Sequence, residues 1–327
     1  PEVGQQQARA NFFVKFKRHT SETIRAGITK VTSLADAAHV LAPFRKYQNE
    51  SFFVLMTDEN DNIVEVMRPS RGSRNATIVN PNMIIPAVAA TPGAKNVWMG
   101  HNHPSGDTSP SPEDITSSEN LGEALESLGY TVRGNMVLGR GRYAREVGGT
   151  AKRIKVSAVP RRQSIKVREN RIAKNPTSDR KQITTPNEAV ALQPEYEIEN
   201  GVLLLDSKNR PVAVVHMTAA ELSALKEGGR ARRILEAVDQ SGAVSAVVYS
   251  SEQRAAENTT RMLLSTGGAR VLDAVVDGVS SFDNSLPLKA GPWFSRNKRK
   301  AAGTTVAQVE TTTTGQFKTG KPVTFNF

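Results

Sequence analysis

The sequence contains no cysteine, and this absence excludes two kinds of structure. A chain without cysteine has neither a disulfide framework nor a metal site built from thiolates. The same absence suits a reducing compartment, so we expect a cytoplasmic location. The sequence also lacks any run of about 18 apolar residues, which a membrane-spanning helix would need. We therefore expect no contact with a membrane.

The charge of the chain is positive and unevenly spread. At 327 residues the chain is long enough for two domains with separate cores, and its formal net charge is +11. Residues 152–181 carry eleven Lys and Arg against Glu169 and Asp179, a local excess of nine. We predict a basic linker over 151–182. It is either a solvated tether or an arm that binds nucleic acid phosphates without sequence preference. Because it has no aromatic residue, base stacking is not indicated.

A histidine pair precedes an acidic helix start near the middle of the first half. His101 and His103 follow the apolar run 97–99, which suits a buried strand, and side chains at i and i+2 share one face of a strand. After seven intervening residues, Ser111 begins the sequence Ser-Pro-Glu-Asp, which has an N-cap serine, a proline at the first helical position and acids in the first turn. Two imidazoles and the Asp114 carboxylate can therefore meet at one point, as in a catalytic zinc site with water as fourth ligand.

Each half of this pattern also has an ordinary explanation. A lone His-x-His is most often a pair of exposed loop histidines, and Ser-x-x-Asp alone is most often a helix capping box. The two halves at this spacing are a much rarer combination, and we favour the metal site.

Two stretches carry a resemblance to a known family, HNHPSGD at 101–107 and SPSPED at 109–114. They resemble the JAMM (MPN+) metalloprotease motif, in the form found in the RadC branch of that superfamily. The resemblance covers about residues 31–147. The family places a general acid/base glutamate on its first strand, and Glu50 matches that position. Many RadC-like chains have Asp-His where this one has Gly134-Asn135, so any role of that pair is absent here.

The resemblance implies a zinc-dependent metallopeptidase or isopeptidase that acts on a protein or peptide substrate. In that scheme His101, His103 and Asp114 bind one Zn²⁺, and Glu50 moves a proton from water to the leaving amine. Ser111 donates a hydrogen bond to the developing oxyanion. The alternative is a RadC-like, DNA-associated accessory module of DNA repair or mobile elements, with a non-catalytic metal site. In this alternative, similar domains look like modules of long, multi-domain phage and plasmid proteins, which would suit a sequence without a starting methionine.

The sequence repeats itself after the basic linker. Residues 202–209 echo 54–61, an apolar strand followed by an acidic turn, and similar echoes flank them. Such a repeat implies a duplicated domain. When the two acidic turns are aligned, Ile198 stands opposite Glu50 and Ser250 stands near the place of His101. We therefore expect the second copy to be degenerate and the chain to bind one zinc.

We predict an α/β (α+β) fold with two tandem JAMM-like domains, each a mixed sheet flanked by helices. The predicted divisions are an N-terminal arm (1–30), a RadC-like metalloprotease domain (31–150), the basic linker (151–182), a degenerate repeat without metal ligands (183–284) and a basic, largely disordered tail (285–327). Within the arm, the apolar residues at 12–14 and 16 form either a short strand or a docking segment.

Overall fold

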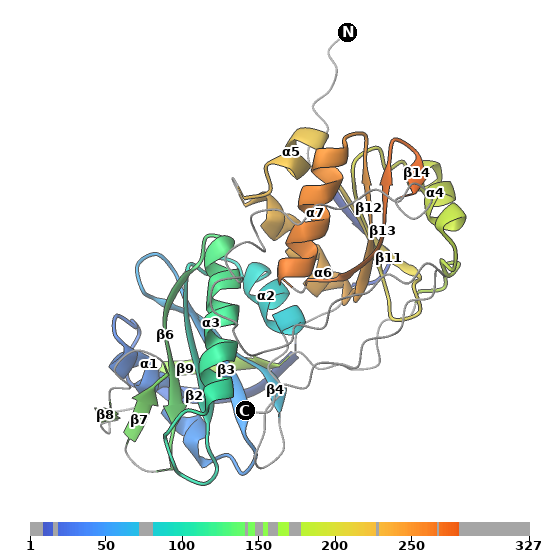
Figure 1. Ribbon diagram of the computed structural model, residues 1–327. Helices are drawn as coiled ribbons and strands as arrows, with labels where there is room; N and C mark the ends of the chain where they lie inside the picture. The colour runs from blue at the N-terminus through green and yellow to red at the C-terminus, as the bar shows by residue number, and fades with distance from the viewer. Residues whose placement is uncertain are drawn as a thin grey trace.

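The protein forms two mixed β-sheets with helices on their faces (Figure 1). The computed structural model describes residues 9–15, 19–71, 81–140, 143–147, 153–155, 163–169, 178–226, 229–266 and 268–280. In this part of the chain, no helix combines the length and the apolar character that a membrane crossing requires. The α/β class and the mixed sheets flanked by helices agree with the prediction from sequence.

The first sheet has eight described strands. They are β2 (His19–Ala26), β3 (Ser51–Thr57), β4 (Ile63–Arg71), β5 (Asn96–Asn102), β6 (Thr131–Leu138), β7 (Tyr143–Glu146), β8 (Arg153–Lys155) and β9 (Gln163–Glu169). Their order is β2-β9-β4-β3-β5-β6-β7-β8. Strands β3 and β5 are antiparallel, whereas β5 and β6 are parallel. Every residue of β3 and β5 is buried, as expected for central strands covered on both faces.

Helices cover both faces of this first sheet. They are α1 (Leu34–Leu41), the 3-10 helix η1 (Ala42–Lys46), α2 (Pro81–Ala89) and α3 (Pro112–Ser127). Strand β3 serves both cores, because its successive side chains point to opposite faces. Phe53 and Leu55 pack with α1 and η1, whereas Val54 and Met56 pack with α2 and α3.

The second sheet has six described strands and four helices. They are β1 (Arg9–Phe12), β10 (Gly201–Leu205), β11 (Pro211–His216), β12 (Ser245–Ser250), β13 (Arg270–Val276), β14 (Val279–Ser280), α4 (Pro186–Glu195), α5 (Ala219–Ser223), α6 (Arg230–Ser241) and α7 (Gln253–Thr266). The strand order is β1-β11-β10-β12-β13-β14. Helix α4 covers one face, and α5, α6 and α7 cover the other.

Four strands of each sheet have the same order and the same relative directions. The order β4-β3-β5-β6 in the first and β11-β10-β12-β13 in the second have the same strand directions throughout. Both parallel pairs are interrupted by a register shift at the same step, after Val97 in β5 and after Ala246 in β12. The acidic turns also agree, since Asp58 and Asp206 each accept hydrogen bonds from the backbone N–H groups two and four residues later.

The two halves share a single apolar core on their facing sides. Helix α2 of the first half packs on α6 of the second, and one cluster of buried residues runs through both. Arg232 on α6 reaches across this junction. Its Nε donates to the carbonyl of Ala89 at 2.8 Å, and its guanidinium NH2 donates to the carbonyl of Thr91 at 3.1 Å.

Two segments that we predicted to lie outside the domains are in part strands. In the predicted arm 1–30, β1 joins the second sheet and β2 joins the first. In the predicted linker 151–182, β9 inserts between β2 and β4 because Ile165 and Val167 alternate with polar residues and are buried in the core. The high positive charge of this segment favoured the prediction of a linker, although the alternation of apolar and polar residues is typical of a strand. The predicted tail 285–327 lies outside the described residues.

Candidate metal centre

Three elements of the first sheet and its helices converge on one point. Strand β5 ends at Asn102 and delivers His101 and, one residue beyond its end, His103. Strand β3 pairs with β5, placing Phe52 opposite His101, and Glu50 directly precedes β3. The first turn of α3 supplies Asp114. Residues from three separate stretches of the chain therefore meet at the end of the central strands.

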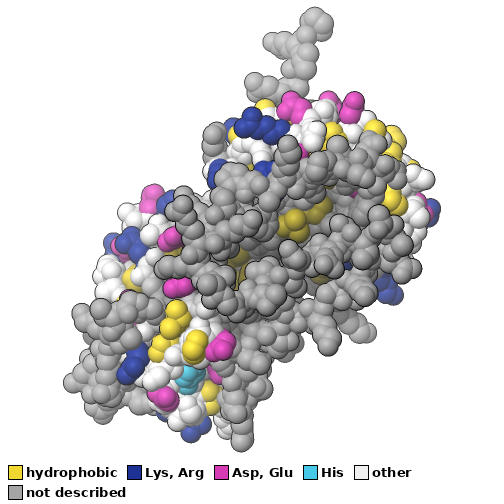
Figure 2. All heavy atoms as spheres, viewed as in Figure 1, with side chains coloured by type: hydrophobic (Ala, Val, Ile, Leu, Met, Phe, Trp, Pro, Cys, Tyr) yellow, Lys and Arg dark blue, Asp and Glu magenta, His cyan; other side chains and the backbone are white. Residues whose placement is uncertain are grey.

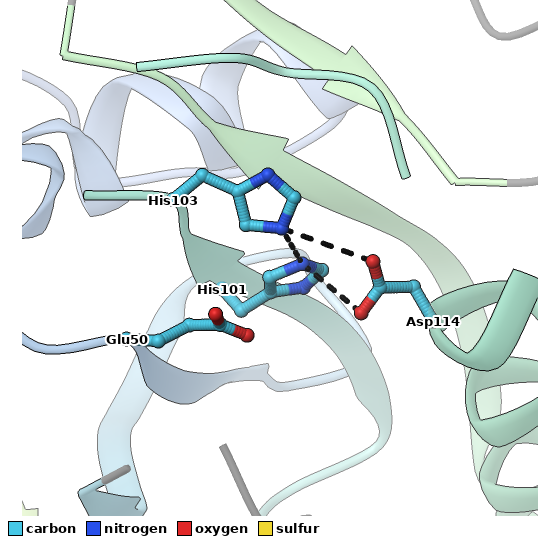
Figure 3. A group of neighbouring side chains, drawn as sticks. All are labelled: Glu50, His101, His103 and Asp114. Atoms are coloured by element: carbon cyan, nitrogen blue, oxygen red, sulfur yellow. Dashed lines mark hydrogen bonds and ion pairs between the residues drawn. The ribbon is translucent and has the colours of Figure 1, made fainter. Parts of the chain in front are cut away.

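The four side chains lie within reach of one metal ion (Figure 3). One potential ligand atom from each of Glu50, His101, His103 and Asp114 can be chosen so that all lie within 4.8 Å of one another. The Nε2 atoms of the two histidines face each other at 3.0 Å. Oxygens of Asp114 lie 3.3 Å from Nε2 of His101 and 3.8 Å from Nε2 of His103. Glu50 approaches from the opposite side to Asp114.

The tautomer of His103 is set by a turn that follows it. Its Nδ1 lies 3.0 Å from the carbonyl oxygen of Asp107, which can only accept a hydrogen bond. Nδ1 therefore carries the proton, and in the neutral ring the lone pair is on Nε2, which faces His101. A ligand histidine commonly donates its other ring nitrogen to a carbonyl in this way.

Asp114 is held by the capping box that starts α3. One of its oxygens, Oδ2, accepts from the backbone N–H of Ser111 at 2.7 Å, and its own backbone N–H donates to the Ser111 hydroxyl at 3.1 Å. Asp114 is thus both a member of the capping box and a potential metal ligand. The two explanations of Ser-x-x-Asp, a helix cap and a metal site, are compatible. Ser111 lies beside the cluster and is not one of its four members, so its catalytic role stays a prediction.

Burial controls the protonation of the cluster. Burial raises the pKa of Glu50 to about 7; the charge of His101 opposes this rise and that of Asp114 adds to it. Burial, with the charge of His101, holds the pKa of His103 below its ordinary value. Burial opposes the ionisation of Asp114, but hydrogen bonds from His101 and Ser111 hold its pKa below its ordinary value. At neutral pH, His103 is therefore neutral and Asp114 charged, the forms that bind a metal.

Two features of the cluster fit a divalent metal. The two imidazole nitrogens point at each other and at a carboxylate that is almost fully buried. Oε1 of Glu50 is also buried and has no hydrogen-bond partner among the described residues. A cation bound among these atoms would satisfy them. Two nitrogens and carboxylate oxygens suit zinc and several other transition metals. Figure 2 shows a histidine at the surface of this part of the molecule, with acidic side chains nearby.

Two buried asparagines lie beside the cluster; sequence reasoning gave Asn102 no role and expected none for Asn135. Asn102, between the two histidines, forms hydrogen bonds with the first residue of β3 and with the segment before it. Asn135 donates to the hydroxyl of Ser118, which donates to the backbone carbonyl of Asp114 at 2.6 Å. The pair Gly134-Asn135 thus retains a structural connection to α3. The signal in the sequence that could have pointed to Asn102 is its place between the two histidines.

The corresponding place in the second sheet has different chemistry. By strand register, Ser250 occupies the position of His101, and its hydroxyl donates to Oδ1 of Asn200 at 2.9 Å. Ile198 occupies the position of Glu50 and is buried in the apolar core. Among the residues that the structure describes, no second group of potential metal ligands comes this close together.

Known proteins resemble the part of the chain that contains the cluster. Residues 31–145 match the family model of the RadC-like JAB domain. A UPF0758 protein of Methanosarcina mazei is 37% identical over 115 residues, which are 35% of this chain and 50% of that protein. A UPF0758 protein of Geobacter sulfurreducens is 36% identical over 106 residues, or 32% and 45% of the two chains. The chain spans about half the length of the curated relatives it matches. Residues 31–145 of this protein are therefore a member of the RadC-like JAB domain family.

Proposed function

We propose that the protein is a zinc-dependent hydrolase that cleaves an amide bond in a protein or peptide. The observation that carries this proposal is the convergence of Glu50, His101, His103 and Asp114 at the end of the central strands. His101, His103 and Asp114 would hold the metal and leave a fourth position open. Zinc in such a site supplies the Lewis acidity that amide hydrolysis needs.

Glu50 is proposed to move the proton in this reaction. In the cluster without a metal, burial raises the pKa of Glu50 to about 7, and a bound cation would lower this pKa and favour the carboxylate form that accepts a proton. Glu50 can therefore accept a proton from the attacking water and then give it to the leaving amine. Ser111, at the start of α3, is proposed to donate a hydrogen bond to the oxygen of the scissile carbonyl as charge develops there.

The test separates the metal ligands from the proton carrier. We would measure zinc content and the cleavage of fluorogenic peptide and isopeptide substrates for the wild-type chain, His101→Ala and Glu50→Gln. His101→Ala should lose zinc and activity together. Glu50→Gln should keep zinc, while its rate falls by roughly 10²–10⁴-fold, as for the loss of a general base. Loss of zinc in Glu50→Gln would make Glu50 a ligand, and unchanged activity would end its assignment.

We also propose that the second sheet and its helices are a degenerate copy of the first half. The common strand order and register shift support a duplication, and Ile198 and Ser250 in place of Glu50 and His101 support the loss of the metal. In this proposal the divisions 31–150 and 183–284 are the two copies. The copies are not independent, because each recruits a strand from the N-terminal segment and their cores merge.

A second candidate function, binding of nucleic acid, is favoured by one observation. On β2 and β9, Arg25 and Lys166 are exposed on the face opposite the core. Such residues gain affinity for phosphates through counterion release. On the face shown in Figure 2, however, the described Lys and Arg side chains lie in separate places. If segment 152–181 binds duplex DNA, replacing Arg25 and Lys166 with Ala should weaken binding at low salt and reduce its salt dependence. Equal DNA affinity of the variant and the wild type would exclude the face that carries Arg25 and Lys166 from the DNA-binding surface.

A further inference from the structure

Asn102 stands between the two histidines and is fully buried. Its side chain bridges from the end of β5 to residues 47–51, the segment that leads into β3 and carries Glu50. Oδ1 accepts from the backbone N–H of Ser51 at 3.0 Å, and Nδ2 donates to the carbonyls of Tyr47 and Asn49 at 3.2 and 3.3 Å. One side chain thus makes hydrogen bonds on both sides of Glu50. We name this set of three hydrogen bonds the Asn102 clip.

Beyond the backbone that carries it, few contacts hold the Glu50 carboxylate in position. Its Oε1 is buried without a hydrogen-bond partner among the described residues, so its place depends on the backbone that carries it. The near end of that backbone is anchored at Tyr47. The Tyr47 hydroxyl donates to Glu22, and the guanidinium of Arg68 lies over its ring, 4.9 Å from the centroid. Between this anchor and β3, the clip ties the segment to the strand of the histidines.

We propose that Asn102 is a positioning residue that holds Glu50 at the metal centre. The inference rests on the proposed function, since Glu50 must face the bound metal to move a proton there. Because Asn102 lies between His101 and His103 on the same backbone, it couples the position of the proton carrier to that of the ligands. A movement of β5 would carry Glu50 with it and preserve the geometry of the site.

The second sheet provides a matched control within the same chain. There Asn200, near the start of β10, accepts from the hydroxyl of Ser250 and from the backbone N–H of Ser251 at 3.0 Å. This amide also joins the two central strands and is also buried. The residue in the place of Glu50 is Ile198, so this second tie positions no proton carrier. Asn200→Ala therefore measures the cost of losing such a tie without touching the site.

The experiment compares the zinc-loaded wild-type chain with Asn102→Ala and Asn200→Ala. Zinc content, kcat and KM on the fluorogenic substrates, and hydrogen exchange of the backbone amides at 47–51 would be measured for each. Asn102→Ala should keep zinc and KM, while kcat falls about 10–100-fold, as for a misplaced catalytic group. Exchange at Ser51 should accelerate by at least about tenfold, because its N–H loses its acceptor. Asn200→Ala should change neither kcat nor exchange at 47–51.

Other results would overturn the proposal. A parallel loss of zinc and kcat in Asn102→Ala would mean that Asn102 supports the ligands and not Glu50. Unchanged kcat with faster exchange would mean that Glu50 does not depend on the clip. If Asn102→Ala does not fold, Asn102→Ser takes its place, and its hydroxyl should give a smaller loss. If the wild-type chain cleaves no substrate, the proposed function fails, and unchanged exchange at Ser51 would still refute the clip by itself.

Discussion

The junction between the two halves depends on Arg232, and its replacement by Ala should destabilise the whole protein. The carbonyl of Ala89 is at the end of α2, where helix carbonyls lack partners within the helix, and Nε of Arg232 donates to it at 2.8 Å. A hydrogen bond from a charged group contributes about 1.5–3 kcal/mol. The carbonyl of Thr91 keeps a second donor, the N–H of Ala94 at 3.3 Å. Losing the Arg232 hydrogen bond to Thr91 should therefore cost less than losing the one to Ala89. Nε also donates to Glu236 on the same helix at 2.9 Å, and this partly exposed pair contributes less than about 1 kcal/mol. Because the Arg232 side chain is one-third exposed, we expect a total loss of about 2 kcal/mol.

Urea unfolding, followed by circular dichroism and by tryptophan fluorescence, measures this loss. With an m-value of about 2–3 kcal/mol/M, the midpoint should fall by roughly 0.7–1 M. Both probes should report one transition, because a common core joins the halves. The control is Arg233→Ala on the same helix, where an exposed pair with Glu221 is lost and less than about 1 kcal/mol is expected. Equal effects of the two variants, or two separate transitions in the wild type, would refute this reasoning.

Three further predictions concern packing, pH and metal. A Cβ at Gly201 would lie 2.1 Å from the backbone oxygen of Val215, so Gly201→Ala should lower the free energy of unfolding by on the order of 4 kcal/mol in thermal unfolding. The control is Gly129→Ala, where the space is open and a loss of about 1 kcal/mol is expected. Burial opposes ionisation of Asp206, but hydrogen bonds from Arg210 and Lys208 hold its pKa below its ordinary value. Its stabilisation is therefore complete above about pH 4 and is lost as the pH falls further, so Asp206→Asn should destabilise more at pH 7 than at pH 3 in urea unfolding. Elemental analysis should find one zinc per chain, and chelation should lower the melting temperature.

The parts of the structure that sequence could predict are those encoded within short stretches. The strand before His101, the histidine spacing and the cap at Ser111 all lie within twenty residues, so their local geometry follows from periodicity and helix-start rules. Glu50 is about fifty residues away, and only the family resemblance pointed to it. The structure brings it to the others because β3 and β5 are neighbours.

The features that sequence missed depend on distant partners. Strand β9 is a strand because β2 and β4 flank it, and the buried ion pair of Arg68 with Glu169 joins residues 101 positions apart. No local pattern encodes such a pairing, and the surrounding positive charge favoured a linker. The helices α5 and α6 were also missed, although Thr218 and Glu221 form a capping box at the start of α5.

The pairing of β1 with the second sheet and of β2 with the first has a consequence for folding during synthesis on the ribosome. Strand β1 is synthesised before the described strands of the first sheet, but its partner β11 follows about two hundred residues later, with Arg9 opposite His216. At about 5–20 residues per second, this delay is on the order of 10–40 s. During that time the strands of the first sheet, including its edge strand β2, can assemble, while β11, the partner of β1, is not yet synthesised. Pairing of β1 with β11 therefore waits until the second sheet is synthesised, and it then joins the N-terminal segment to that sheet.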